Sequence, residues 1–98
     1  MTQAEIDSLL EAMQSQFEQS GDDADRPGVI NFETNDWVER AKLPTCCTSL
    51  GRGIRYRGVR VLISRDRTSG VLSRGEAQAA GHDGGPYEDL KSREDAAV

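Results

Sequence analysis

Apolar residues recur with helical spacing over the first seventeen residues of the chain, MTQAEIDSLLEAMQSQF. Five of them fall at i, i+3, i+4, i+7 and i+11 and so share one face of an α-helix: Ile6, Leu9, Leu10, Met13 and Phe17. Thr2 and Glu5 have the spacing of a capping box, and Glu5 and Asp7 place negative charge where the helix dipole favours it. The pattern predicts an amphipathic helix within residues 1–18.

The apolar stripe of this helix has two interpretations. It either packs in the core of a globular domain or enters the groove of a partner protein, where helices are anchored at i, i+3, i+4 and i+7. The stretch that follows, QSGDDADRPG at residues 19–28, is acidic, contains Gly and Pro, and lacks a large apolar residue. We therefore expect residues 19–28 to be an acidic flexible linker, since nothing rewards ordering them.

Residues 29–45, VINFETNDWVERAKLPT, form the second segment with apolar content. Its start, VINF, predicts an extended patch with one aromatic residue. Asn35 or Asp36 can cap a short helix over residues 36–42, which Pro44 ends. This segment therefore predicts an aromatic patch followed by a second, short helix.

Residues 46–75 are basic and rich in Gly and Arg. Within them, residues 54–73 predict a marginal β-hairpin. Apolar and charged residues alternate over its first strand, and the alternation shifts by one position at Gly58, as a β-bulge would cause. The second strand would lie within residues 68–73. A two-stranded hairpin on its own is marginal in water.

The composition argues against a large apolar core. Leu, Ile, Val and Phe provide 19 of the 98 residues, close to the fraction below which chains are disordered. The net charge is −8 over residues 1–36, +7 over residues 37–75 and −4 over residues 76–98. Such blocks attract one another without defining a unique packed core. We therefore expect a mostly irregular, disordered chain with one N-terminal helix, in which residues 76–98 form an acidic tail.

Residues with catalytic or metal-binding chemistry are few. Cys46 and Cys47 are adjacent, without the two-residue gap that lets two thiolates face one zinc ion, and His82 is a single distant ligand. The sequence has no nucleophile motif and no phosphate-binding glycine loop in the required strand and helix context. We therefore expect a binding protein without metal or cofactor, and not an enzyme.

Arginines surround Tyr56, at positions 52, 55, 57, 60, 65 and 67. Side chains of this kind suit a nucleic-acid backbone, and they equally suit charge balance with the acidic flanks. Because the run contains one aromatic residue and no RNA-binding signature, nucleic acid is the less favoured partner. The sequence has no apolar run of membrane-spanning length, so direct membrane insertion is not expected.

The N-terminal segment resembles a known motif. The residues QAEID at positions 3–7 and the pair at Leu9 and Leu10 match the N-terminal motif of bacterial flagellar motor switch proteins of the FliM type, commonly SQAEIDALL, with Ser8 where Ala is frequent. Related versions occur in switch proteins of the FliN/FliY type, and a looser version ends the chemotaxis phosphatase CheZ. Further along, RAKLPT at residues 40–45 is similar to an Arg-x-x-x-Pro-Thr element at the entry to the middle domain of switch proteins.

The resemblance implies a function in chemotaxis. In FliM-type proteins the segment is disordered alone and becomes helical on phosphorylated CheY, the response regulator that reverses the motor. Carried over to this chain, the resemblance implies a partner-binding site of six residues: Glu5, Ile6, Asp7, Leu9, Leu10 and Met13. It also implies other flagellar switch proteins as partners. The location it implies is the cytoplasm, or the cytoplasmic face of the inner membrane at the flagellar basal body.

The resemblance ends at about Thr45. FliM-type proteins continue with a long amphipathic helix, whereas this chain continues CCTSLGRGIRYRGVRVLISRDRTSG. Both a divergent short protein and a product that is truncated or read in a shifted frame agree with this change. Two alternatives to a response-regulator-binding protein therefore stay open. One is a small nucleic-acid-binding or regulatory protein that uses its Arg-rich region and packs its N-terminal helix internally, and the other is a non-functional truncated product.

Overall fold

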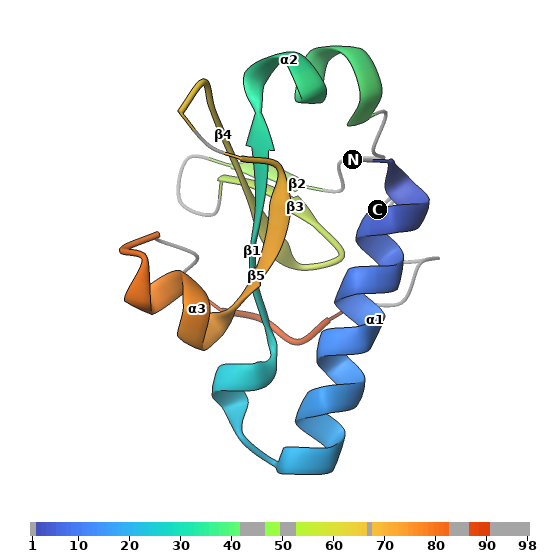
Figure 1. Ribbon diagram of the computed structural model, residues 1–98, viewed down its shortest axis with the longest axis vertical. Helices are drawn as coiled ribbons and strands as arrows, with labels where there is room; N and C mark the ends of the chain where they lie inside the picture. Colours follow the sequence, from blue (N-terminus) through green and yellow to red (C-terminus); the bar gives the residue numbers. More distant parts are fainter. Residues whose placement is uncertain (1, 42–46, 50–52, 67, 83–86, 91–98) are drawn as a thin grey trace.

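The computed structural model describes residues 2–41, 47–49, 53–66, 68–82 and 87–90 of the chain (Figure 1). In chain order the elements are α1 (Gln3–Ser20), the 3-10 turn η1 (Asp23–Asp25), β1 (Pro27–Glu33), α2 (Thr34–Asp36), the π-helical turn η2 (Trp37–Ala41), β2 (Cys47–Ser49), β3 (Gly53–Tyr56), β4 (Val59–Ser64), β5 (Gly70–Ser73) and α3 (Arg74–Ala79).

The strands form a five-stranded mixed sheet in the order β2-β3-β4-β1-β5. Strand β1 lies parallel to β4, with Ile30 opposite Val61, and antiparallel to β5, with Ile30 opposite Val71. Strand β3 pairs antiparallel with both β2 and β4. Because both neighbours of β1 come much later in the chain, the centre of the sheet depends on long-range pairing.

Helix α1 runs along one side of the sheet and completes the core (Figure 1). The buried apolar cluster takes residues from α1, β1, β3 and β4: Ile6, Leu10, Ile30, Phe32, Tyr56, Val59 and Val61. Partly buried apolar residues pack around this cluster, among them Trp37 after α2 and Val71 in β5. Of the apolar stripe of the N-terminal helix, Ile6 and Leu10 are therefore buried within the chain itself.

The expectation of a mostly irregular, disordered chain is wrong. Apolar residues are few, but they are concentrated where elements meet, and in β1 every residue from 27 to 32 is buried. Two arginines, Arg55 and Arg57, are also buried, so their aliphatic stems add to the interior while carboxylates accompany their charges. The average composition therefore underestimated the core that these positions build. The chain has a packed core although its charges are arranged in blocks along the sequence.

The β-hairpin lies at a different place from the prediction. Instead of one bulged strand, residues 53–64 form two strands, β3 and β4, joined by a turn at Arg57 and Gly58. The backbone φ angles of these two residues are 52° and 84°, and a two-residue type I′ turn requires positive φ at both positions. The predicted second strand, within residues 68–73, instead contains β5, which pairs with β1.

The short helix predicted over residues 36–42 begins earlier and is irregular. Glu33, and not Asn35 or Asp36, is the capping residue, because its carboxylate accepts from the backbone N–H groups of Asn35 at 3.0 Å and Asp36 at 3.2 Å. One turn of α-helix, α2, continues as the π-helical turn η2, and residue 42 lies outside the described residues. Trp37 packs edge-on against Phe32 with 5.2 Å between the ring centres, which ties this segment to the core.

The segment between α1 and β1 is short, comprising residues 21–26, and it contains the turn η1. Gly21 ends α1 with a φ of 71°, its N–H donating to the carbonyl of Phe17 at 2.7 Å. Asp22 then caps the turn η1, and Pro27 and Gly28 already belong to β1. At Gly28 the strand lies against the backbone of Arg74, where α3 begins.

Helix α3, which was not predicted, begins with a capping box. The Ser73 hydroxyl accepts from the N–H of Glu76 at 3.2 Å, and the Glu76 carboxylate accepts from the N–H of Ser73 at 3.0 Å. The expected acidic tail therefore begins within a helix. Beyond it, residues 83–86 and 91–98 lie outside the described residues.

Candidate functional site

Helix α1 carries all six residues of the predicted partner-binding site, and it is capped at both ends. At its start, the Thr2 hydroxyl accepts from the N–H of Glu5 at 3.3 Å and donates to the Glu5 carboxylate at 3.1 Å. At its end, Gly21 adopts the left-handed conformation that typically closes a helix. These caps satisfy backbone groups that a helix terminus leaves without partners, so the local sequence alone favours this helix.

One face of α1 is buried against the sheet. Ile6 and Leu10 are both 0% exposed and pack in the cluster that also contains Ile30, Phe32 and Val61. Burying a side chain of this size contributes about 1.5–3 kcal/mol. The two predicted anchors therefore stabilise the fold of the chain.

A polar cluster accompanies these apolar contacts. Asp7 is 4% exposed, and its Oδ1 accepts a hydrogen bond from the Tyr56 hydroxyl at 2.7 Å and another from the Arg57 guanidinium at 3.1 Å. The Gln3 amide donates to the same Tyr56 oxygen at 3.1 Å, and the Glu11 carboxylate lies 3.8 Å from Arg57. A buried carboxylate without such partners would be strongly destabilising, so Tyr56 and Arg57 are needed wherever Asp7 is buried.

The environment of Tyr56 changes its acidity. Burial raises the pKa of its hydroxyl above the ordinary value of 10.0, because the interior disfavours the charged phenolate. The hydrogen bond that it donates to Asp7 raises the pKa further, whereas the bond from Gln3 and the charge of Arg57 act in the opposite direction. At neutral pH Tyr56 is therefore protonated, and its hydroxyl donates a hydrogen bond to Asp7 of α1.

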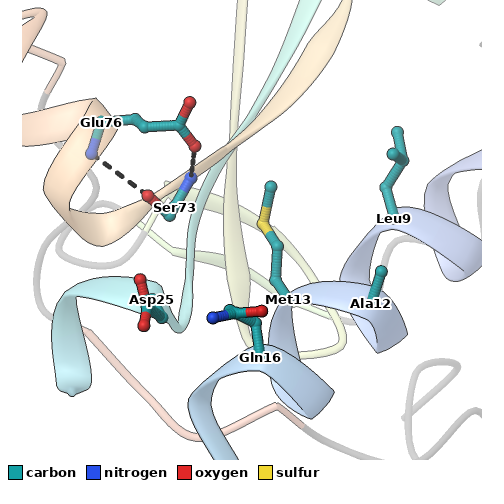
Figure 2. A pocket seen from close by; sticks show the side chains of 7 residues that line it. All are labelled: Leu9, Ala12, Met13, Gln16, Asp25, Ser73 and Glu76. Atoms are coloured by element: carbon teal, nitrogen blue, oxygen red, sulfur yellow. Dashed lines mark hydrogen bonds between the residues drawn. The ribbon is translucent and has the colours of Figure 1, made fainter. Parts of the chain in front are cut away.

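The adjacent face of α1 borders an open groove (Figure 2). Leu9, Ala12, Met13 and Gln16 line it from α1, and Asp25, Ser73 and Glu76 line it from η1, β5 and α3. Its volume is about 390 Å³. Leu9 is 41% exposed and Met13 is half-buried, so both present apolar surface to solvent.

The structure thus distributes the six predicted residues over two environments. Ile6, Asp7 and Leu10 face the interior, whereas Leu9 and Met13 border the groove and Glu5 is exposed at the first turn. They lie on one helix, but they do not form one accessible surface. While α1 is packed on the sheet, a second protein can reach only Glu5, Leu9 and Met13 among the six.

The residues that hold Asp7 in place, Tyr56 and Arg57, were not predicted as part of the site. Tyr56 and Arg57 were predicted to lie in a strand and in a basic run, and their role at Asp7 depends on the turn that brings the end of β3 against α1. The glycine at position 58, after alternating apolar residues and before Val59, was the signal for this turn.

Two further arginines of the basic region, Arg55 and Arg74, also lie near a carboxylate or an aromatic ring. Arg55 donates to the carbonyl of Gly58 at 2.8 Å and lies 3.6 Å from the Glu88 carboxylate. Arg74 lies over the ring of Tyr87, 4.8 Å from its centre, and donates to the carbonyl of Glu88 at 3.0 Å. The ion pairs of Arg55 with Glu88 and of Arg57 with Asp7 balance charge between the basic middle and the acidic flanks. Because both arginines are buried, they are not part of an exposed basic surface.

The described part of the chain brings together no group of three or more His, Cys, Asp or Glu side chains suited to a metal ion. Of the three residues considered as metal ligands, Cys46 lies outside the described residues and Cys47 begins β2. Nδ1 of His82 lies 3.1 Å from the side-chain amide nitrogen of Asn31. Among the described helices, none has the length and apolar character needed to cross a membrane.

Comparison of the chain with known protein families, with curated proteins and with solved structures gave no match.

Proposed function

We propose that this chain is a chemotaxis protein of the flagellar switch type, whose helix α1 binds a phosphorylated CheY-type response regulator. One observation carries the proposal. The residues that match the FliM-type motif, at positions 3–7 and at Leu9 and Leu10, lie together on a helix with a cap at each end. A helix is the conformation that the resemblance implies for the segment when it is bound.

The chemistry of α1 agrees with this role. The helix combines apolar side chains at i, i+3 and i+4, namely Ile6, Leu9 and Leu10, with acidic groups at Glu5 and Asp7. An amphipathic helix of this kind binds an apolar groove, and its carboxylates favour a groove bordered by basic groups. Binding in this way links the chain to control of the direction of flagellar rotation, within the switch or by lowering the concentration of free activated regulator.

The proposal is tested by isothermal titration of the full chain with the regulator, phosphorylated and unphosphorylated. We expect a dissociation constant in the micromolar range for the phosphorylated form, corresponding to about −8 kcal/mol. The unphosphorylated form is expected to bind at least about tenfold more weakly, which is a difference of about 1.4 kcal/mol. Equal affinity for the two forms would contradict the proposal.

A matched pair of variants assigns the binding to α1. Leu9→Ala removes an exposed apolar side chain without opening the core, so we expect the phosphorylated regulator to bind about tenfold more weakly. Ser15→Ala changes an exposed position on another side of the same helix and is expected to leave the affinity unchanged. If both variants bind as the parent chain does, the binding does not involve this face of α1.

A further inference from the structure

Three of the six residues assigned to partner binding already have partners within the chain. Ile6 and Leu10 are in the core, and Asp7 is bound by Tyr56 and Arg57. Side chains buried in this way cannot contact a second protein at the same time. A partner that binds these three residues therefore has to displace the sheet from α1.

The surface of the sheet that receives α1 has the chemistry of a helix-binding groove. Its apolar part includes Ile30, Phe32 and Val61, and its polar part provides the cation of Arg57 and the hydroxyl donor of Tyr56. A groove of this composition binds an acidic amphipathic helix through apolar anchors and a charge-assisted hydrogen bond. The chain thus contains its own groove for the segment that the regulator is proposed to bind.

Gly21 separates α1 from the short segment that leads to β1. It is exposed, and no heavy atom lies within 4 Å of the position that a Cβ would occupy. Two contacts hold the end of the helix near β1. The Ser20 hydroxyl donates to Asp25 at 2.6 Å, and the Arg26 guanidinium lies 3.9 Å from the centre of the Phe17 ring. Because the connection to β1 is short, a released helix stays at a high effective concentration near its groove.

We infer that α1 is an autoinhibitory latch, docked on its own sheet in a closed state and available to the response regulator through Ile6, Asp7 and Leu10 only in an open state. The inference rests on the proposed function, because it concerns regulation of the same residues. The apparent affinity then scales with the open population: a chain that is open about 1% of the time binds about 100-fold more weakly than one that is always open. The contacts of Asp7 and the burial of Ile6 and Leu10 together set this population.

The test opens the latch from the sheet side and leaves α1 unchanged. Arg57→Asn removes the cation that faces Asp7, and Asn accepts the positive φ of 52° at this position, so the turn before Gly58 is kept. Tyr56→Phe removes the hydroxyl that faces Asp7 and keeps the ring in the core, and it serves as a second, independent opening variant. Arg65→Gln is the charge-matched control, because Arg65 is exposed in a turn after β4.

Two measurements are made on each full-length variant. The first is hydrogen exchange of the α1 amides in the free chain, with the amides of β1 and β4 as the internal reference. The second is isothermal titration with the phosphorylated regulator. We expect both opening variants to exchange the α1 amides at least about tenfold faster than the parent chain, with β1 and β4 unchanged, and to bind the regulator at least about tenfold more tightly. The control Arg65→Gln is expected to match the parent chain in both measurements.

The outcomes separate the latch from the proposed function. If the parent chain and the opening variants bind the phosphorylated regulator with equal affinity, the latch is overturned and the proposed function stands. Exchange that accelerates equally in α1, β1 and β4 also overturns the latch, because the helix then has no opening of its own. If neither the parent chain nor an opening variant binds the regulator, the proposed function is overturned and the latch has no partner to regulate.

Discussion

The hydroxyl of Tyr56 donates a hydrogen bond of 2.7 Å to the carboxylate of Asp7, joining residues that are 49 positions apart in the chain. Arg57, the next residue, donates to the same carboxylate oxygen at 3.1 Å. A single side chain near the start of α1 is therefore bound by two successive residues at the end of β3. Because hydrogen bonds are directional, these contacts specify where α1 lies on the sheet, whereas apolar contacts alone are less selective.

Removal of the Asp7 carboxylate should destabilise the fold. Asp7→Ala leaves the buried Arg57 without its nearest carboxylate, and loss of one partner of a buried ion pair costs about 3–5 kcal/mol. We expect a loss near the lower limit, because the exposed Glu11 carboxylate lies 3.8 Å from Arg57 and compensates in part. Urea denaturation of Asp7→Ala measures this loss, and Ser8→Ala, at the exposed neighbouring position, should change the stability by less than about 0.5 kcal/mol. Similar losses in the two variants would argue against a structural role for the cluster.

Adjacent leucines on α1 should differ sharply in their effect on stability. Leu10 is 0% exposed and Leu9 is 41% exposed, although both belong to the same predicted stripe. Leu10→Ala leaves a cavity in the core and should cost about 2–5 kcal/mol, whereas Leu9→Ala should cost less than about 1 kcal/mol. Thermal or urea unfolding of the two variants under identical conditions makes the comparison. Equal costs would show that α1 does not pack on the sheet through Leu10.

Tyr56 should make the stability of the chain depend on pH in the alkaline range. Burial and the hydrogen bond to Asp7 raise its pKa in the folded chain above the ordinary value of 10.0, so the unfolded chain ionises first. The stability that protonated Tyr56 contributes is fully present below about pH 10 and is lost as the pH rises through the raised pKa. Above pH 10 the free energy of unfolding of the parent chain should therefore fall more steeply than that of Tyr56→Phe, by up to about 1.4 kcal/mol per pH unit. Denaturation curves recorded at several pH values test this, and parallel curves for the two chains would contradict it.

The addition of a methyl group should lower the stability of the chain at Gly28 and leave it nearly unchanged at Gly70. At Gly28 a Cβ would lie 2.8 Å from the backbone N and Cα of Arg74, which is itself held by a hydrogen bond of 2.8 Å from its N–H to the carbonyl of Arg26. Gly28→Ala should therefore cost about 1–3 kcal/mol, because backbone has to move. At Gly70 no heavy atom lies within 4 Å of the corresponding position, so Gly70→Ala should be nearly neutral. The melting temperatures of the two variants measure this difference, and a neutral Gly28→Ala would contradict the close approach of β1 and α3.

Local sequence was sufficient for α1 and insufficient for the sheet. Thr2, the apolar periodicity and Gly21 are all signals within one segment, and the helix lies over Gln3–Ser20. In contrast, the parallel pairing that places Ile30 opposite Val61 joins segments far apart in the chain, and periodicity within either segment does not specify the register. The turn at Arg57 was missed because Arg is not among the residues that usually adopt positive φ.

The candidate site was predictable only as a set of residues on one helix. Neighbouring residues on an α-helix point about 100° apart, so Leu9 and Leu10 meet different surroundings unless a groove encloses both. Which of them faces the sheet depends on the position of α1, and that position depends on Tyr56 and Arg57. The resemblance therefore identified the motif, while the division into buried and exposed members required the tertiary contacts.

The order of the strands also has a consequence for synthesis. A ribosome makes α1 before the sheet, and the groove that receives this helix is complete only when β3 and β4 have followed, because Tyr56, Val59 and Val61 all contribute to it. Until then a nascent chain presents Ile6 and Leu10 without their sheet, as transiently exposed apolar surface. The time for which α1 is freely accessible thus depends on translation as well as on equilibrium, because the groove needs Val61 of β4.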